Sequence, residues 1–153
     1  MADRMEELHM FITDTHRSQI RGHLTLMEKQ FQVLQRLSDY TEEQFLADLI
    51  LQAAGERALH LALESLTDIG NIIIDALIMR DPASYEDIFE ILTEETVFTR
   101  EFYDHFIDLV RFRKLLAHEY DKLEASAVWH YVRKHAGDFP TLRDSISTYV
   151  KLG

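Results

Sequence analysis

The chain has 153 residues, a formal net charge of −11 and no cysteine. The lack of cysteine excludes disulfides and thiolate chemistry and fits a cytoplasmic location. The acidic balance argues against a general nucleic-acid-binding surface, so we expect no DNA partner. No apolar run approaches the roughly 20 residues that a membrane span requires, and we expect no membrane partner. The length predicts a single domain over residues 1–153.

The spacing of the apolar residues predicts an all-α chain. Only 5 Gly and 2 Pro occur, and no segment keeps the alternation of a strand. The first helix is expected over residues 4–38. Thr41 and Gln44 have the pattern of a capping box. They predict a second long helix that runs to about Met79 or breaks once near Gly55.

Shorter helices follow in the second half of the chain. Ser84 is expected to cap a short helix of sequence SYEDIFEIL, and a long helix should begin near Thr99 after a turn. A further helix is expected over residues 125–135, and Thr141 is expected to cap the last one. Long helices joined by short connections favour an antiparallel bundle.

The stretch RFRKLLAHEY, residues 111–120, places cationic side chains among apolar ones. On an ideal helix Arg113 falls on or close to the apolar stripe, and a buried guanidinium without an anion is costly. It therefore either pairs with a carboxylate or borders a cleft that admits an anionic ligand. Glu64 and Asp68 of the preceding long helix are the candidate ion-pair partners.

His118 falls on another face of the same predicted helix, about 140° from Arg113. A straight helix would not aim both side chains at one small atom. Either the helix bends or ends near Ala117, or long side chains converge on a groove, or a second subunit completes the site. Ile107 and Leu115 on the face of His118 favour a subunit contact.

An arginine and a histidine together suit the cleavage of a phosphodiester bond in RNA without a metal. The guanidinium fork matches phosphate oxygens and stabilises charge that develops on phosphorus. The imidazole titrates near neutral pH and transfers the proton of the 2′-hydroxyl or of the leaving oxygen. These two residue types at this spacing also occur by chance in many helices.

The segment from Arg113 to Tyr120, RKLLAHEY, resembles the Arg-x4-His-x-Tyr motif of the HepT-like toxins in the HEPN superfamily. Three stretches resemble successive segments of that family in the same order: ALHLALESLTDIGNIII, SYEDIFEIL and FIDLVRFRKLLAHEYDKLEASAVWHYV. The resemblance implies a homodimer of antiparallel helical bundles, each with a HEPN-like four-helix core and additional short helices. It also implies a metal-independent endoribonuclease toxin that acts on RNA.

The same resemblance implies roles for individual residues. Arg113 and His118 would be catalytic at a cleft between two subunits. Independently of the resemblance, we consider Arg111 and Lys114 candidates for holding phosphate. Tyr120 would be the position that a minimal nucleotidyltransferase (MNT-type) antitoxin modifies with AMP. Many members have Asn where this chain has Lys114. The lysine either helps to hold phosphate or marks a branch with weakened nuclease activity.

Two other interpretations remain open. The chain could be a non-catalytic helical dimer that binds a nucleotide or a nucleotidyltransferase, or a structural dimer in which Arg113 simply pairs with Glu64 or Asp68. We expect no cofactor and no metal. His60 and Glu64 have the ligand spacing of a helical metal site, but this motif is not repeated in the chain. His105 is not part of a repeated metal-binding motif either.

Overall fold

The computed structural model describes residues 11–153, and every regular element in that range is helical. This confirms the predicted all-α fold. The elements, in chain order, are α2 (Asp14–Leu37), α3 (Glu42–Leu46), α4 (Leu49–Ala76), α5 (Tyr85–Glu94), α6 (Arg100–Ala117), the 3-10 helix η1 (Tyr120–Lys122), α7 (Ala125–His135) and α8 (Phe139–Val150). Within that part of the chain, no helix has the length and apolar character needed to cross a membrane.

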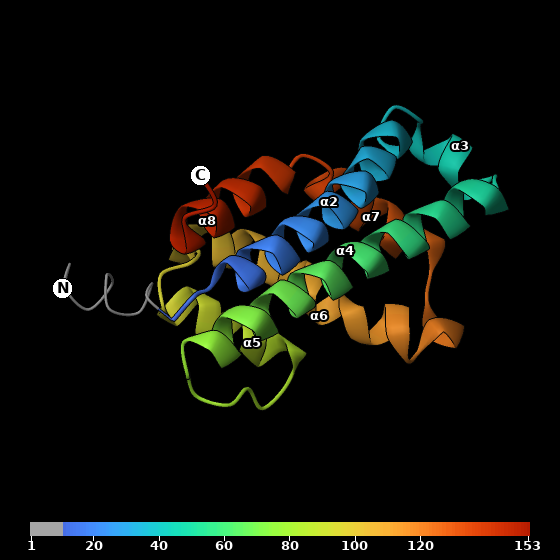
Figure 1. Cartoon of the computed structure of the whole chain (residues 1–153). Coiled ribbons are helices and arrows are strands. Elements are labelled where there is room, and N and C mark those ends of the chain that lie inside the picture. Colours follow the sequence, from blue (N-terminus) through green and yellow to red (C-terminus); the bar gives the residue numbers. More distant parts are fainter. Residues whose placement is uncertain (1–10) are drawn as a thin grey trace.

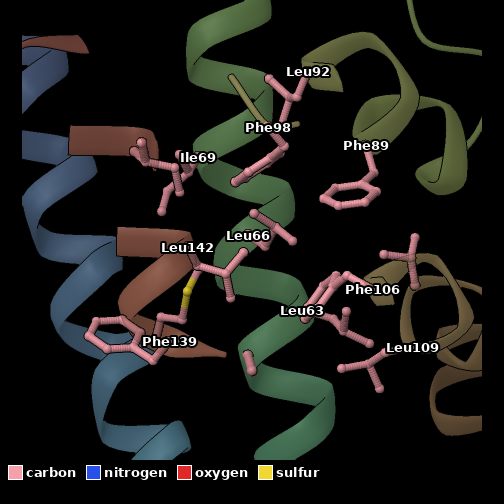
Figure 2. Close-up of a cluster of buried hydrophobic side chains, with 14 of the residues drawn as sticks. Leu63, Leu66, Ile69, Phe89, Leu92, Phe98, Phe106, Leu109, Phe139 and Leu142 are labelled. Atoms are coloured by element: carbon pink, nitrogen blue, oxygen red, sulfur yellow. The ribbon is translucent and has the colours of Figure 1, made fainter. Parts of the chain in front are cut away.

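The long helices α2 and α4 lie side by side and run in opposite directions (Figure 1). Helix α4 is central, because α5, α6 and α7 also pack against it. Figure 2 shows how its apolar side chains reach neighbours on both sides. The buried cluster drawn there joins residues from α4, α5, α6, α8 and the loop before α6: Leu63, Leu66, Ile69, Phe89, Leu92, Phe98, Phe106, Leu109, Phe139 and Leu142.

Three predicted helix starts are confirmed by their capping hydrogen bonds. The backbone N–H of Gln44 donates to the Thr41 hydroxyl over 3.1 Å, and the Gln44 side chain accepts from the Thr41 N–H over 2.9 Å. The Ser84 hydroxyl accepts from the N–H three residues later at the start of α5. Thr99 does the same for α6. Each bond satisfies an N–H that would otherwise lack a partner at the helix start.

The two long helices differ from their predicted bounds. Helix α2 begins only after Thr13, whose side chain caps it, so the predicted start of the first helix at residue 4 is wrong for residues 11–13. Residues 4–10 of that predicted helix lie outside the described part of the chain. The second helix breaks at Asp48 and not near Gly55, because the Asp48 carboxylate accepts from two N–H groups and starts α4. Helix α4 ends at Ala76, three residues before Met79.

The last helix begins before its predicted cap. Helix α8 starts at Phe139, so Thr141 lies inside the first turn and does not cap the helix. Pro140 fits the first turn because its missing N–H would have no partner within the helix there. The predicted helix over residues 125–135 is confirmed with its bounds.

Candidate active site at the end of helix α6

Helix α6 ends at Ala117, which is one of the possibilities that the sequence left open. His118 forms the C-cap with φ −126° and ψ −24°, and its backbone N–H donates to the carbonyl of Lys114. Tyr120 then begins the short helix η1, and 74 % of its surface is exposed. His118 is exposed as well. The end of α6 therefore presents an imidazole and a phenol to solvent within three residues.

Arg113 lies one turn earlier and has a different environment, with only 8 % of its surface exposed. Its Nε atom donates to Oε1 of Glu64 over 2.9 Å. The same carboxylate oxygen lies 3.3 Å from Nε2 of His60. The central carbon of the guanidinium lies 3.2 Å from the ring centroid of Tyr85, a cation–π contact. Arg113 is thus enclosed by groups from α4 and α5.

Glu64 therefore occupies the position of the ion-pair partner, whereas Asp68 lies elsewhere. Asp68 instead lies near His23 of α2, with Nδ1 of His23 and Oδ2 of Asp68 separated by 3.8 Å. The interactions of Arg113 join it to Glu64 and Tyr85, and none of them joins it to His118. Tyr85 was not predicted as part of this site, because the first residue of a short helix carries no periodic pattern.

The two candidate phosphate-binding residues are exposed and paired with acids. Nε of Arg111 donates to Oε1 of Glu86 over 2.9 Å, and this hydrogen bond raises the pKa of Arg111 above its usual value. Nζ of Lys114 lies 3.7 Å from Oε1 of Glu119. Exposed pairs of this kind contribute little free energy. A phosphate could therefore replace either carboxylate at small cost.

The predicted reason for a subunit contact is only partly supported. Ile107 is buried within its own chain and cannot contribute to an interface, and Leu115 is half-buried against the same core. Larger apolar surface lies elsewhere. Leu49 and Ile50, at the first turn of α4, are 80 % and 79 % exposed, and Leu46 of α3 lies close to them in the chain.

Comparison with known proteins identifies the family of this chain. The sequence pattern of the family described as ribonuclease HepT-like matches residues 27–147. YutE of Bacillus subtilis (strain 168), a proposed RNase, is 34 % identical over 134 residues, which cover 86 % of this chain and 88 % of YutE. The mRNA nuclease HepT of Shewanella oneidensis is 30 % identical over 103 residues, covering 67 % of this chain and 77 % of HepT.

Solved structures extend the likeness to three dimensions. The structure of YutE, described as a cytosolic protein of unknown function, has a TM-score of 0.76 and 31 % identity, covering 88 % of this chain and 90 % of that one. A tri-AMPylated HEPN toxin of Shewanella oneidensis, in complex with an MNT antitoxin, has a TM-score of 0.74 and 25 % identity. That match covers 85 % of this chain and 97 % of the toxin chain.

Proposed function

The chain belongs to the HepT-like ribonuclease family, which makes ribonuclease its enzyme class, and from this premise we propose that it is the endoribonuclease toxin of a toxin–antitoxin pair. One observation carries the proposal. His118 and Tyr120 of the Arg-x4-His-x-Tyr motif stand exposed directly after α6, one turn from Arg113. A proton-transfer group and a phosphate-binding group thus lie near one accessible end of the bundle.

In the proposed reaction the 2′-oxygen of RNA attacks the adjacent phosphorus. A P–O2′ bond forms, the P–O5′ bond breaks, and the products are a 2′,3′-cyclic phosphate and a 5′-hydroxyl. His118 takes the proton of the 2′-hydroxyl or gives one to the leaving O5′. Arg113 stabilises the negative charge on the non-bridging oxygens as the phosphorane develops.

In this proposal Arg113 leaves Glu64 to reach RNA, and the partial exposure of Glu64 supports such an exchange. Glu64 is only half-buried, so solvent screens the ion pair on one side. A phosphodiester offers Arg113 the same charge and geometry that the carboxylate offers. We therefore propose that Glu64 neutralises Arg113 until the backbone of the substrate replaces it.

A homodimer is the second element of the proposal. The apolar side chains Leu46, Leu49 and Ile50 are exposed at the N-terminal end of α4, and this end of the bundle also carries the C-terminal end of α6 (Figure 1). A second copy that covers this surface would bring additional groups close to His118. Light scattering of the purified chain at micromolar concentration should give the mass of a dimer, and a monomer would remove the shared cleft.

We propose that regulation occurs at Tyr120, in the cytoplasm, through a nucleotidyltransferase of the MNT type. The phenol of Tyr120 is exposed and needs no rearrangement to reach an enzyme that transfers AMP. An attached AMP would place a phosphate anion two residues from His118. Its charge and bulk would keep RNA away from the site.

The decisive experiment is RNA cleavage by the purified chain in the presence of EDTA. We expect cleavage by the wild type and losses of about 100-fold or more in His118→Ala and in Arg113→Ala. Arg143→Ala is the matched control and should retain full activity, because this exposed arginine of α8 is paired with Asp144 and lies outside the motif. Cleavage that survives in both motif variants would place the active site elsewhere.

A second candidate function is a non-catalytic dimer that binds a nucleotide or a nucleotidyltransferase. The enclosure of Arg113 by Glu64 and Tyr85 favours it, because a guanidinium already satisfied is less available for catalysis. Absence of cleavage by every form, together with tight binding of the partner, would support this function over the nuclease.

A further inference from the structure

A group of histidine and carboxylate side chains lies where α6, α7 and α8 meet, away from the motif. Nε2 of His105 lies 3.0 Å from both carboxylate oxygens of Asp138. Nδ1 of His135 lies 2.6 Å from Oδ2 of the same carboxylate. One ligand atom from each of the three residues lies within 4.8 Å of the other two. The residues are up to 33 positions apart, which is why the sequence did not reveal the group.

The Asp138 side chain points towards the two histidines and does not cap the helix that follows it. It occupies the N-cap of α8, where an aspartate ordinarily accepts hydrogen bonds from the first N–H groups of the helix. Its side chain makes no such bond, and its backbone has φ −85° and ψ −10° instead of the extended values typical of a cap. The carboxylate is therefore free to serve the two imidazoles.

His135 is held in the way that metal-binding histidines are held. Its side chain is fully buried, and its second nitrogen, Nε2, lies 2.9 Å from Oδ1 of Asp108. A metal-bound histidine nearly always gives its other N–H to such a carboxylate, which fixes its tautomer and orientation. Asp108 is itself held by Nζ of Lys134 over 2.6 Å.

From this arrangement we propose that His105, His135 and Asp138 bind a divalent transition-metal ion of the Zn²⁺ class, with Asp108 as the outer carboxylate. Two imidazoles and one carboxylate are a donor set that Zn²⁺ accepts, and a fourth position remains for water. Nitrogen and oxygen ligands about 2.0–2.1 Å from the ion would stand about 3.3 Å apart in a tetrahedron. The present spacings of 2.6 and 3.0 Å therefore need to open by about 0.7 and about 0.3 Å.

The side chain of His105 is 40 % exposed and gives an ion a route from solvent. The bound ion would tie three helices together at a point about 20 Å along α6 from His118, given 1.5 Å per residue. The site is thus independent of the proposed ribonuclease site. Its role would be to stabilise the junction of the helices, and RNA cleavage does not require it.

Calorimetric titration of the tag-free, full-length chain with ZnCl₂ tests the proposal, with the thermal midpoint measured in parallel. We expect one equivalent per chain and a higher midpoint with zinc. His105→Ala should abolish the stoichiometric binding, and Asp108→Asn should weaken it about 10- to 100-fold. His130→Ala is the matched control, because this exposed histidine of α7 lies outside the group.

Cobalt binding can be followed by absorption, which depends neither on the heat of binding nor on thermal stability. Co²⁺ in a tetrahedral site should give a strong visible absorption band in the wild type and in His130→Ala, and none in His105→Ala. Because His105 is partly exposed, its variant should remain folded, which circular dichroism checks. Lack of stoichiometric binding by the wild type, or equal binding by His105→Ala, would overturn the proposal. Either result would leave the ribonuclease proposal intact.

Discussion

Nε of Arg113 and Oε1 of Glu64 lie 2.9 Å apart and link the motif helix α6 to the central helix α4. The arginine that the motif offers for phosphate is therefore neutralised by a carboxylate of its own chain. The pair has two consequences. It stabilises the packing of α6, and it sets what an RNA phosphate must displace.

The first prediction concerns the stability that this pair supplies. Glu64→Ala leaves the Arg113 guanidinium nearly buried without its acceptor, which costs about 1–3 kcal/mol of unfolding free energy. Urea unfolding of the variant at neutral pH measures the loss. Asp68→Ala is the control on the same helix, and because Asp68 is exposed its effect should stay within about 0.5 kcal/mol. Equal losses in both variants would contradict a specific role for Glu64.

The second prediction concerns the close packing of α4 on α5. A Cβ atom on Gly70 would lie 2.6 Å from Cγ2 of Ile88 and 3.2 Å from Cδ1 of Leu92. Gly70→Ala should therefore overpack this contact and lower the unfolding free energy by about 1–3 kcal/mol. The gain in helix propensity, up to about 1 kcal/mol, is too small to reverse the sign.

Gly22→Ala is the matched control for Gly70→Ala. Gly22 also lies inside a long helix, but no atom comes within 4 Å of a Cβ placed there. The substitution should stabilise the chain by up to about 1 kcal/mol, because alanine loses less backbone entropy in a helix. Thermal unfolding of the two variants should therefore shift in opposite directions, and shifts in the same direction would contradict the packing argument.

The sequence predicted the helices best where local chemistry decides them. The caps at Thr41, Ser84 and Thr99 depend on side chains three residues from the backbone they satisfy, and all three are confirmed. The break at Asp48 was missed because the apolar pattern continues through it, and only the folded chain shows its carboxylate at two N–H groups. Thr141 was a misleading cap, since Pro140 allows the helix to start earlier.

The candidate site was predictable to the extent that its residues are close in sequence. The motif from Arg113 to Tyr120 is contiguous, and the angular mismatch between Arg113 and His118 correctly indicated that the helix could end near Ala117. The enclosure of Arg113 by Tyr85 could not be predicted, because that contact depends on how α5 packs on α6. The grouping of His105 with His135 has the same cause and lay beyond the sequence.

The third prediction concerns acid stability. The guanidinium of Arg80 and the N–H of Ala83 donate to the Asp87 carboxylate and lower its pKa to about 2 from 3.8. A carboxyl with a lowered pKa in the folded state contributes stability above its unfolded pKa and loses it as the pH falls through the folded value. Wild type should therefore exceed Asp87→Asn in stability at pH 5–7.

Urea unfolding across the acid range checks this sign. The difference between wild type and Asp87→Asn should stay constant down to about pH 4 and disappear as the pH approaches about 2. Asp75→Asn, an exposed aspartate at the end of α4, is the control and should show a smaller difference throughout. A difference that grows on acidification would contradict the lowered pKa.

The fourth prediction concerns Lys114, which directly follows Arg113 of the motif. The Lys114 ammonium is exposed, and its contact with Oε1 of Glu119 is long, at 3.7 Å. It is therefore available to the RNA backbone. We expect Lys114→Asn to raise KM for RNA a few-fold and to leave kcat near the wild-type value, because an exposed charge binds substrate and transition state alike. Steady-state kinetics at two salt concentrations measure this. A tenfold rise in kcat would instead show that the lysine suppresses cleavage.

The last prediction concerns control of the site through Tyr120. Co-expression with a nucleotidyltransferase of the MNT type should increase the intact mass by whole AMP units, because the Tyr120 phenol is 74 % exposed. Peptide mapping should place the modification on Tyr120, and the modified chain should lose RNA cleavage. Tyr120→Phe should keep the unmodified mass, whereas Tyr40→Phe, which alters another exposed tyrosine, should still be modified. Modification that persists in Tyr120→Phe would show that another residue is modified. Cleavage that persists in the modified chain would show that the added phosphate does not block RNA.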